Sequence, residues 1–298
     1  MKRIVFKQFL SILVLSLIFA GNVEAKKKAN TKIPADLTGK TREYYIQAIK
    51  GDDKAQLMLA HSYQEGEGAP KDITKAIHWY TKAAQQGNVI AQFNLGDIYD
   101  SGNGVNQDFA KAAHWYRKAA DQGDAMAQCS LGNCYYNGDG LQVDYNQAAF
   151  WFRKAAMQGN AVGQRCLGIC YYEGKGVPQD SKIAIEWYEK AAAQGDAVAQ
   201  FNLGNLYANG EGVKKDLKKA AAWFKKAASQ GNAQAQYRLG EMYRDGNGVK
   251  ADLNLAFMFF SSSAENGNRK ALKSIDAKLL KAIGKKGGSS WLKRLLNK

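Results

Sequence analysis

The chain has 298 residues, a formal net charge of +15 and 46% hydrophobic residues, which is enough to build a sizeable buried core. The positive charge is concentrated at the two ends, because residues 51–267 contain 22 basic and 23 acidic side chains. This balance excludes a basic groove for nucleic acid along the central part of the chain.

The first 25 residues have the pattern of a secretory signal peptide. Three basic residues precede the apolar run 9–20, and Val23 and Ala25 are the small residues that signal peptidase requires before the cut. The run is shorter than the roughly 20 residues that cross a membrane, so an uncleaved anchor is the minor alternative. We predict cleavage after Ala25 and export of a bacterial chain to the periplasm or the medium.

Residues 26–50 carry seven basic and two acidic side chains, and we expect this segment to contain a partial capping helix. Residues 268–298 are also basic. Two interpretations remain open for these ends: they are solvated surface, or they make weak contact with an anionic surface.

A glycine recurs every 36 residues through the centre of the chain, and no insertion interrupts the register. A fixed period of this length is typical of a solenoid of stacked helical units. Other positions keep the same step, including a Gly-x-Gly, a tyrosine and a tryptophan that becomes Phe259 in the sixth copy. The glycines that mark the period are Gly51, Gly87, Gly123, Gly159, Gly195, Gly231 and Gly267.

The second copy shows what one unit predicts. Its first segment, 88–100, and the segment that follows Asp108 each place apolar residues on one face of a helix. Asp108 is suited to capping the second helix, and the period glycine to ending it in a left-handed conformation. Gly96 lies inside the first helix, where it costs roughly 1 kcal/mol against alanine, so we expect the partner helix to approach closely there. The predicted fold is all-α, with no strands.

The pattern Leu95-Gly96-x-x-Tyr99, followed by Gly102-x-Gly104 and later by Trp115-Tyr116, resembles a Sel-one-like repeat. This is the 36-residue relative of the tetratricopeptide repeat, and the resemblance covers residues 51–267 in six copies. It implies a right-handed α-solenoid whose first helices line a concave face. It also implies a protein that assembles others rather than an enzyme, and many bacterial members act outside the cytoplasm.

The tetratricopeptide register, carried over through the Leu-Gly-x-x-Tyr pattern, identifies the side chains on the concave face. We predict that a protein or peptide partner binds there to a monomer, without a cofactor or a metal ion. Asn133 and Asn205 are candidates to clamp a peptide main chain, and ordinary solvated helix surface is the alternative for each position. The predicted partner-binding residues are Phe93, Asp97, Asn133, Tyr136, Arg165, Tyr172, Phe201, Asn205, Tyr237 and Arg244.

After the repeats, Leu272, Ile275, Leu279 and Ile283 recur at helical spacing. We predict one capping helix over 268–284 that covers the last repeat, followed by a basic flexible tail, 285–298.

Four cysteines, Cys129, Cys134, Cys166 and Cys170, lie on the first helices of adjacent copies. Equivalent positions on packed helices are about 8–10 Å apart, whereas a disulfide needs Cα atoms within about 7 Å. Buried free thiols are therefore favoured, and a diagonal pair that involves Cys166 is the better candidate if a bond forms.

The sequence also leaves one enzymatic hypothesis open. Ser290-Trp291-Leu292-Lys293 matches the Ser-x-x-Lys motif of penicillin-recognising enzymes, to which some cysteine-rich relatives have been linked. The companion motifs are absent from the sequence, so a β-lactamase-like envelope protein is the less favoured hypothesis.

Overall fold

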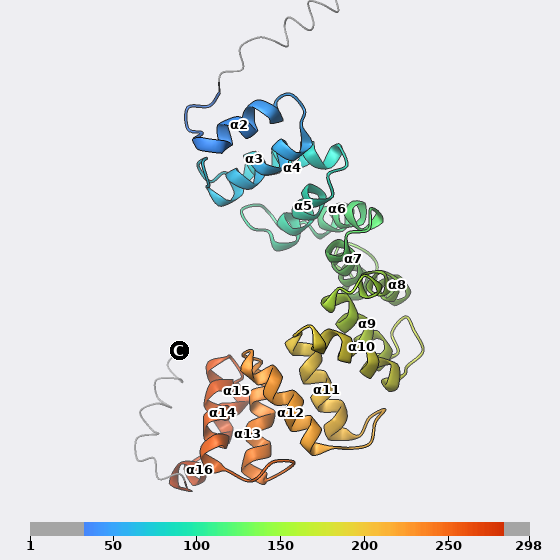
Figure 1. Cartoon of the computed structure of the whole chain (residues 1–298), viewed down its shortest axis with the longest axis vertical. Helices are drawn as coiled ribbons and strands as arrows, with labels where there is room; N and C mark the ends of the chain where they lie inside the picture. The colour runs from blue at the N-terminus through green and yellow to red at the C-terminus, as the bar shows by residue number, and fades with distance from the viewer. Residues whose placement is uncertain (1–32, 283–298) are drawn as a thin grey trace, which may run out of the picture. The chain divides into compact units, whose positions relative to one another are not determined.

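The computed structural model describes residues 33–282, and within that range it contains fifteen helices, α2 to α16, and no strand (Figure 1). The predicted signal peptide and the tail 285–298, with Ile283, lie outside the described residues. The all-α prediction is confirmed for the part of the chain that is described. Between residues 33 and 282, no helix has the length and apolar character needed to cross a membrane.

The described residues divide into two compact units, 33–88 and 89–282. The first unit contains α2 (Gly39–Ala48), α3 (Asp53–Glu65) and α4 (Ile73–Gln85). Helix α2 packs on α3, which agrees with a capping helix before the first repeat. Gln56 of α3 is buried and donates from Nε2 to the carbonyl oxygen of Ala48 at the end of α2 (3.0 Å).

The second unit is a run of paired helices in which each helix from α5 to α14 packs against the next one in the chain, and α16 packs on α14. The first ten helices are each 13 residues long, so the 36-residue register of the sequence becomes a constant helix length. The helices are α5 (Val89–Ser101), α6 (Phe109–Asp121), α7 (Ala125–Asn137), α8 (Tyr145–Met157), α9 (Ala161–Glu173), α10 (Ser181–Ala193), α11 (Ala197–Asn209), α12 (Leu217–Ser229), α13 (Ala233–Asp245), α14 (Leu253–Glu265), α15 (Arg269–Ser274) and α16 (Ala277–Ala282).

The predicted helix caps are present. Asp216 accepts the backbone N–H of Lys219 at the start of α12 (2.9 Å), and Asp196 accepts that of Ala199 at the start of α11 (2.7 Å). Gly231, the period glycine after α12, has the predicted left-handed backbone with φ 83°. These contacts satisfy backbone groups that a helix terminus leaves unpaired, and they set where each helix begins and ends.

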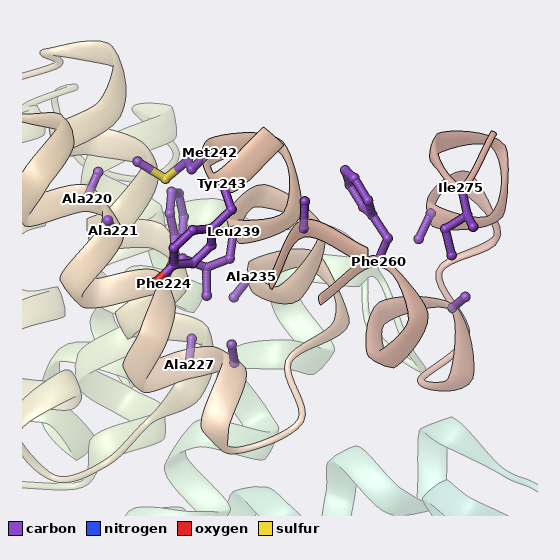
Figure 2. Packing of buried hydrophobic residues seen from close by; sticks show 14 of the residues in the cluster. Ala220, Ala221, Phe224, Ala227, Ala235, Leu239, Met242, Tyr243, Phe260 and Ile275 are labelled. Atoms are coloured by element: carbon purple, nitrogen blue, oxygen red, sulfur yellow. The ribbon is translucent and has the colours of Figure 1, made fainter. Parts of the chain in front are cut away.

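In the second to sixth repeats, the glycine inside the first helix is explained by close packing against the second helix. A Cβ atom on Gly204 would lie 2.4 Å from Cε1 of Phe224, and one on Gly96 would lie 2.5 Å from Cδ1 of Tyr116. The close neighbour is therefore an aromatic ring of the second helix. Figure 2 shows how Phe224 of α12 points toward Leu239, Met242 and Tyr243 of the next repeat.

The capping segment differs from the prediction of a single helix. The chain forms α15 and α16, two short helices separated at Ile275, whose backbone leaves the helical region with ψ 70°. Ile275 and Leu279 are nevertheless buried in the same apolar cluster as Phe260 of the last repeat. The segment therefore covers the apolar end of the repeats, and the bend at Ile275 lets two helical turns reach it from different directions.

Candidate binding face on the first helices

The ten predicted partner-binding residues lie on five first helices, α5, α7, α9, α11 and α13. Asp97, Asn133 and Arg244 are exposed, and the other seven are half-buried. We call this set, with its immediate neighbours on the same helices, the first-helix face. Its members differ in how firmly the rest of the protein holds them.

Three aromatic members of the face also belong to the packing between paired helices. The ring centroid of Phe93 lies 5.8 Å from that of Tyr116, and Phe201 lies at the same distance from Phe224. Tyr237 lies 5.7 Å from Phe260. Each of these side chains therefore spans from the surface into the core.

Two tyrosines of the face are tied to the following repeat. The Tyr172 hydroxyl donates to Oε2 of Glu211 (2.7 Å), and this bond together with burial raises the Tyr172 pKa. The Tyr136 hydroxyl donates to Oε2 of Glu173 (2.5 Å) and accepts from Nζ of Lys175 (3.0 Å). These bonds hold both rings in one orientation along the face.

The two predicted arginines already have internal partners. Arg165 forms an ion pair with Asp196, the N-cap residue of α11, at 3.0 Å between Nε and Oδ2. Arg244 contacts Asp245 with two nitrogen atoms, at 2.8 and 3.0 Å. Arg165 therefore joins α9 to the start of α11, and Arg244 is the exposed one of the two arginines.

Asn205 lies where two pockets meet. One pocket, of about 270 Å³, is lined by Ile169, Tyr172 and Asn202, among other residues of α9, α10 and α11. The other, of about 290 Å³, is lined by α11, α12 and α13 and includes Ala208 and Glu241. Asn205 contributes to both, so the structure places this predicted clamp residue between two hollows on the first-helix face.

The register argument did not identify Asn202 or Tyr188, which also line the first pocket. A signal for Asn202 was present, because asparagine also stands at the equivalent position 94. Tyr188 lies on the second helix α10 and is almost fully buried. Its ring reaches the pocket floor because the facing residue, Gly168, has no side chain to cover it.

Near the other end of the face, Asp97 is exposed while Asp100 and Asp139 are half-buried. Burial raises the pKa of the Asp100 carboxyl, and the negative charges of Asp139 and Asp97 act in the same direction. The Tyr116 hydroxyl donates weakly to Asp100 (3.4 Å) and opposes this shift. The face therefore carries uncompensated negative charge across α5 and the loop after α7.

The four cysteines are buried and free, as the sequence favoured. Burial raises the pKa of Cys129, Cys134 and Cys170 to about 12, and the Cys166 pKa is raised by the same cause. The Cys129 thiol lies 3.4 Å from Oδ1 of Asn160, the N-cap residue of α9. These thiols act as small core side chains rather than as nucleophiles.

Within residues 33–282, no three His, Cys, Asp or Glu side chains are grouped closely enough to hold a metal ion. Ser290 and Lys293, the basis of the enzymatic alternative, lie outside the described residues.

Comparison with protein families matches the Sel1 repeat to residues 53–88, 89–124, 125–160, 161–196, 197–232 and 233–268. Comparison with curated proteins gives no match. Among solved structures, a protective antigen present in uropathogenic Escherichia coli strains, which displays an SLR fold, is similar to this chain. It is 39% identical with a TM-score of 0.76, and the match covers 83% of this chain and 53% of the E. coli protein.

A Sel1 repeat protein from Oxalobacter formigenes is 37% identical with a TM-score of 0.70, and the match covers 78% of this chain and 69% of that protein. This chain thus spans only about half of the E. coli protein but most of the O. formigenes one. The six repeat matches account for most of the sequence, from residue 53 to residue 268. The chain therefore belongs to the Sel1 repeat family.

Proposed function

We propose that this chain is an exported, monomeric scaffold that binds a protein or peptide partner on the first-helix face, with Asn205 at the centre of the site. Sel1 repeat proteins are generally scaffolds for protein–protein interaction. The observation that carries the proposal here is the pair of pockets that meet at Asn205.

The chemistry of the two pockets suits an extended peptide. The Asn205 side chain offers a donor and an acceptor, which is what the N–H and C=O groups of a peptide main chain require. The hollows on either side, of about 270 and 290 Å³, are large enough for side chains. Apolar residues such as Ile169 and Leu206 line the first pocket, and a few polar groups accompany them, as in typical binding sites.

The wall of the first pocket is held in place before any partner arrives. Tyr172, which lines it, is bonded to Glu211 of the next repeat. A side chain that is already ordered loses little rotamer entropy on binding, where a free one costs about 0.5–1.5 kcal/mol. This preorganisation favours a binding role for Tyr172 over that of an ordinary surface tyrosine.

Export is part of the proposal and rests on the signal-peptide pattern of residues 1–25. The likeness to a protective antigen of E. coli agrees with a location outside the cytoplasm. N-terminal sequencing of the chain from cell fractions tests this: the expected result is a periplasmic or secreted chain that begins at Lys26. A cytoplasmic chain with an intact N-terminus would refute export and leave the binding site untouched.

The binding site is tested by selecting peptides from a random displayed library against the full chain and measuring their affinities for variants. Asn205→Ala is expected to lower the affinity of the selected peptides about tenfold, which is about 1.4 kcal/mol of binding free energy. The matched control is Asn146→Ala, which changes an exposed asparagine on a second helix. Both variants should keep the helical circular dichroism of the parent. Peptides that bind both variants with the parent's affinity would place the site elsewhere.

A further inference from the structure

The fifth repeat, residues 197–232, differs from the others in charge. It contains six lysines and two acidic residues, whereas each other repeat has at least as many acidic as basic side chains. All six lysines are exposed, and all lie on α12 or in the loop before it. We call them the lysine face: Lys214, Lys215, Lys218, Lys219, Lys225 and Lys226.

The charges of the lysine face are not neutralised internally. Within residues 33–282, none of the six lysines forms an ion pair. At the position equivalent to Lys219, Lys111 pairs with its helix cap Asp108 at 2.9 Å. Both lysines lie over a tyrosine ring, Lys111 over Tyr99 and Lys219 over Tyr207, but Lys219 does not pair with its helix cap Asp216. The positive field of this repeat is therefore directed outward.

A pocket of about 410 Å³ lies beside the lysine face. Lys225 and Lys250 line it together with Tyr243, Asp252 and the apolar residues Val249, Ala251 and Leu255. The lining comes from α12, α13, the loop after α13 and α14. The pocket thus brings three apolar residues together with ammonium groups from two successive repeats.

The identity of residue 225 distinguishes this pocket from the same place in earlier repeats. At the equivalent positions, Arg117 and Arg153 donate to the hydroxyls of Tyr135 and Tyr171 in the following repeat. Lys225 lies over the ring of Tyr243, with Nζ 5.6 Å from the centroid, and makes no hydrogen bond in the described structure. The ammonium is therefore available at the pocket to a group outside the chain.

We propose that the lysine face and this pocket bind an acidic segment of a partner protein, which seats one apolar side chain in the pocket between flanking carboxylates. Charge complementarity selects the acidic residues, and Val249, Ala251 and Leu255 select the apolar one. An anionic membrane is the less suitable occupant. A membrane-binding helix inserts apolar side chains, and α12 exposes no large hydrophobic residue. This surface is separate from Asn205, so it stands independently of the first-helix site.

Fluorescence anisotropy with the full chain tests the proposal, using three labelled probes. These are a glutamate-rich peptide with one central leucine, the same peptide with serine in place of leucine, and the leucine peptide with lysines in place of glutamates. The expected result is binding of the first probe, weaker binding of the second and none of the third. Raising the salt concentration from about 50 to about 300 mM should weaken the binding of the first probe, because exposed charges are screened.

Lys218→Glu combined with Lys225→Glu should lower the affinity for the glutamate–leucine peptide about tenfold or more, since like charges then face each other. The matched control is Lys182→Glu with Lys190→Glu, the same change of charge on the second helix of the fourth repeat. Asn205→Ala should leave this peptide unaffected, which separates the two sites. Helical circular dichroism confirms that each variant is folded.

Three outcomes would overturn the proposal. Equal loss of affinity in the two double variants would mean that net charge alone matters. Equal binding of the serine and leucine peptides would exclude the pocket. Binding to phosphatidylglycerol vesicles that depends on Lys218 and Lys225, without binding of the peptides, would assign the surface to a membrane.

Discussion

The side-chain amide of Gln230 donates a hydrogen bond of 2.9 Å to the carboxamide oxygen of Gln200. Gln200 in turn donates from Nε2 to the carbonyl oxygen of Ala192, near the end of the preceding α10 (3.1 Å). One buried glutamine therefore joins the ends of two second helices in successive repeats. The same side-chain bond recurs between Gln86 and Gln56, Gln122 and Gln92, Gln158 and Gln128, and Gln194 and Gln164.

We expect Gln200→Ala to lower the melting temperature, because the Ala192 carbonyl and the Gln230 amide both lose a partner. The loss of a buried hydrogen bond of this kind costs about 1–3 kcal/mol. Thermal unfolding followed by circular dichroism measures the change. Gln234→Ala, an exposed glutamine on α13, is the control. If the two variants unfold at the same temperature, the glutamine contacts do not hold the repeats together.

Gly204→Ala is expected to destabilise the protein although alanine favours helix by roughly 1 kcal/mol. The added methyl would lie 2.4 Å from the Phe224 ring, which is buried and cannot move away freely. Adding Phe224→Leu should recover part of the lost melting temperature by making room. An unchanged melting temperature in the single variant would show that the ring is not the reason for glycine at this position.

Asp100→Asn is expected to raise the unfolding midpoint at pH 7. The pKa of this carboxyl is raised in the folded state, so its ionised form is more costly folded than unfolded at neutral pH. As the pH falls through the raised pKa toward about 3.9, the parent takes up a proton on folding and gains stability, and the advantage of the variant shrinks.

Urea unfolding between pH 7 and pH 4 measures this difference, with Glu189→Gln as the control at an exposed carboxylate. A constant difference across the range would contradict the raised pKa.

The four thiols should react slowly with a thiol reagent at pH 8 in the native protein and rapidly after unfolding. Their raised pKa values leave almost no thiolate at this pH, and burial blocks access. Counting the labelled thiols by mass spectrometry, without reductant, gives the result. Fewer than four labels on the unfolded chain would indicate a disulfide that the structure does not contain.

The local features of the fold could be predicted because each depends on residues that are near one another in the chain. Asp216 caps α12 through a backbone N–H three residues away, and Gly231 follows the end of α12 because its backbone must be left-handed. Gly204 predicted a close contact with the partner helix, because nothing within its own helix explained a glycine at this position. Repetition strengthened each of these inferences, because the same residue type recurred at the same step.

The candidate sites depended more on contacts between different helices. The register named Asn205 as a candidate binding residue, but only the packed structure showed that it lines two pockets. The same register could not show that Arg165 pairs with Asp196, or that Phe201 packs on Phe224, because both partners come from other helices. The bend at Ile275 could not be predicted either, because the helical spacing of the apolar residues continues across it.

By itself, the sequence determined the repeat length, the all-α fold, the helix caps and the family, because these follow from periodicity and from backbone preferences over short distances. Only the tertiary structure decided which surface side chains are free. Lys225 occupies the same repeat position as Arg117 and Arg153, yet it lacks their bond to the tyrosine of the next repeat. The physical reason is that a contact between repeats depends on the length and direction of two side chains, and the periodicity of the sequence contains no information about either.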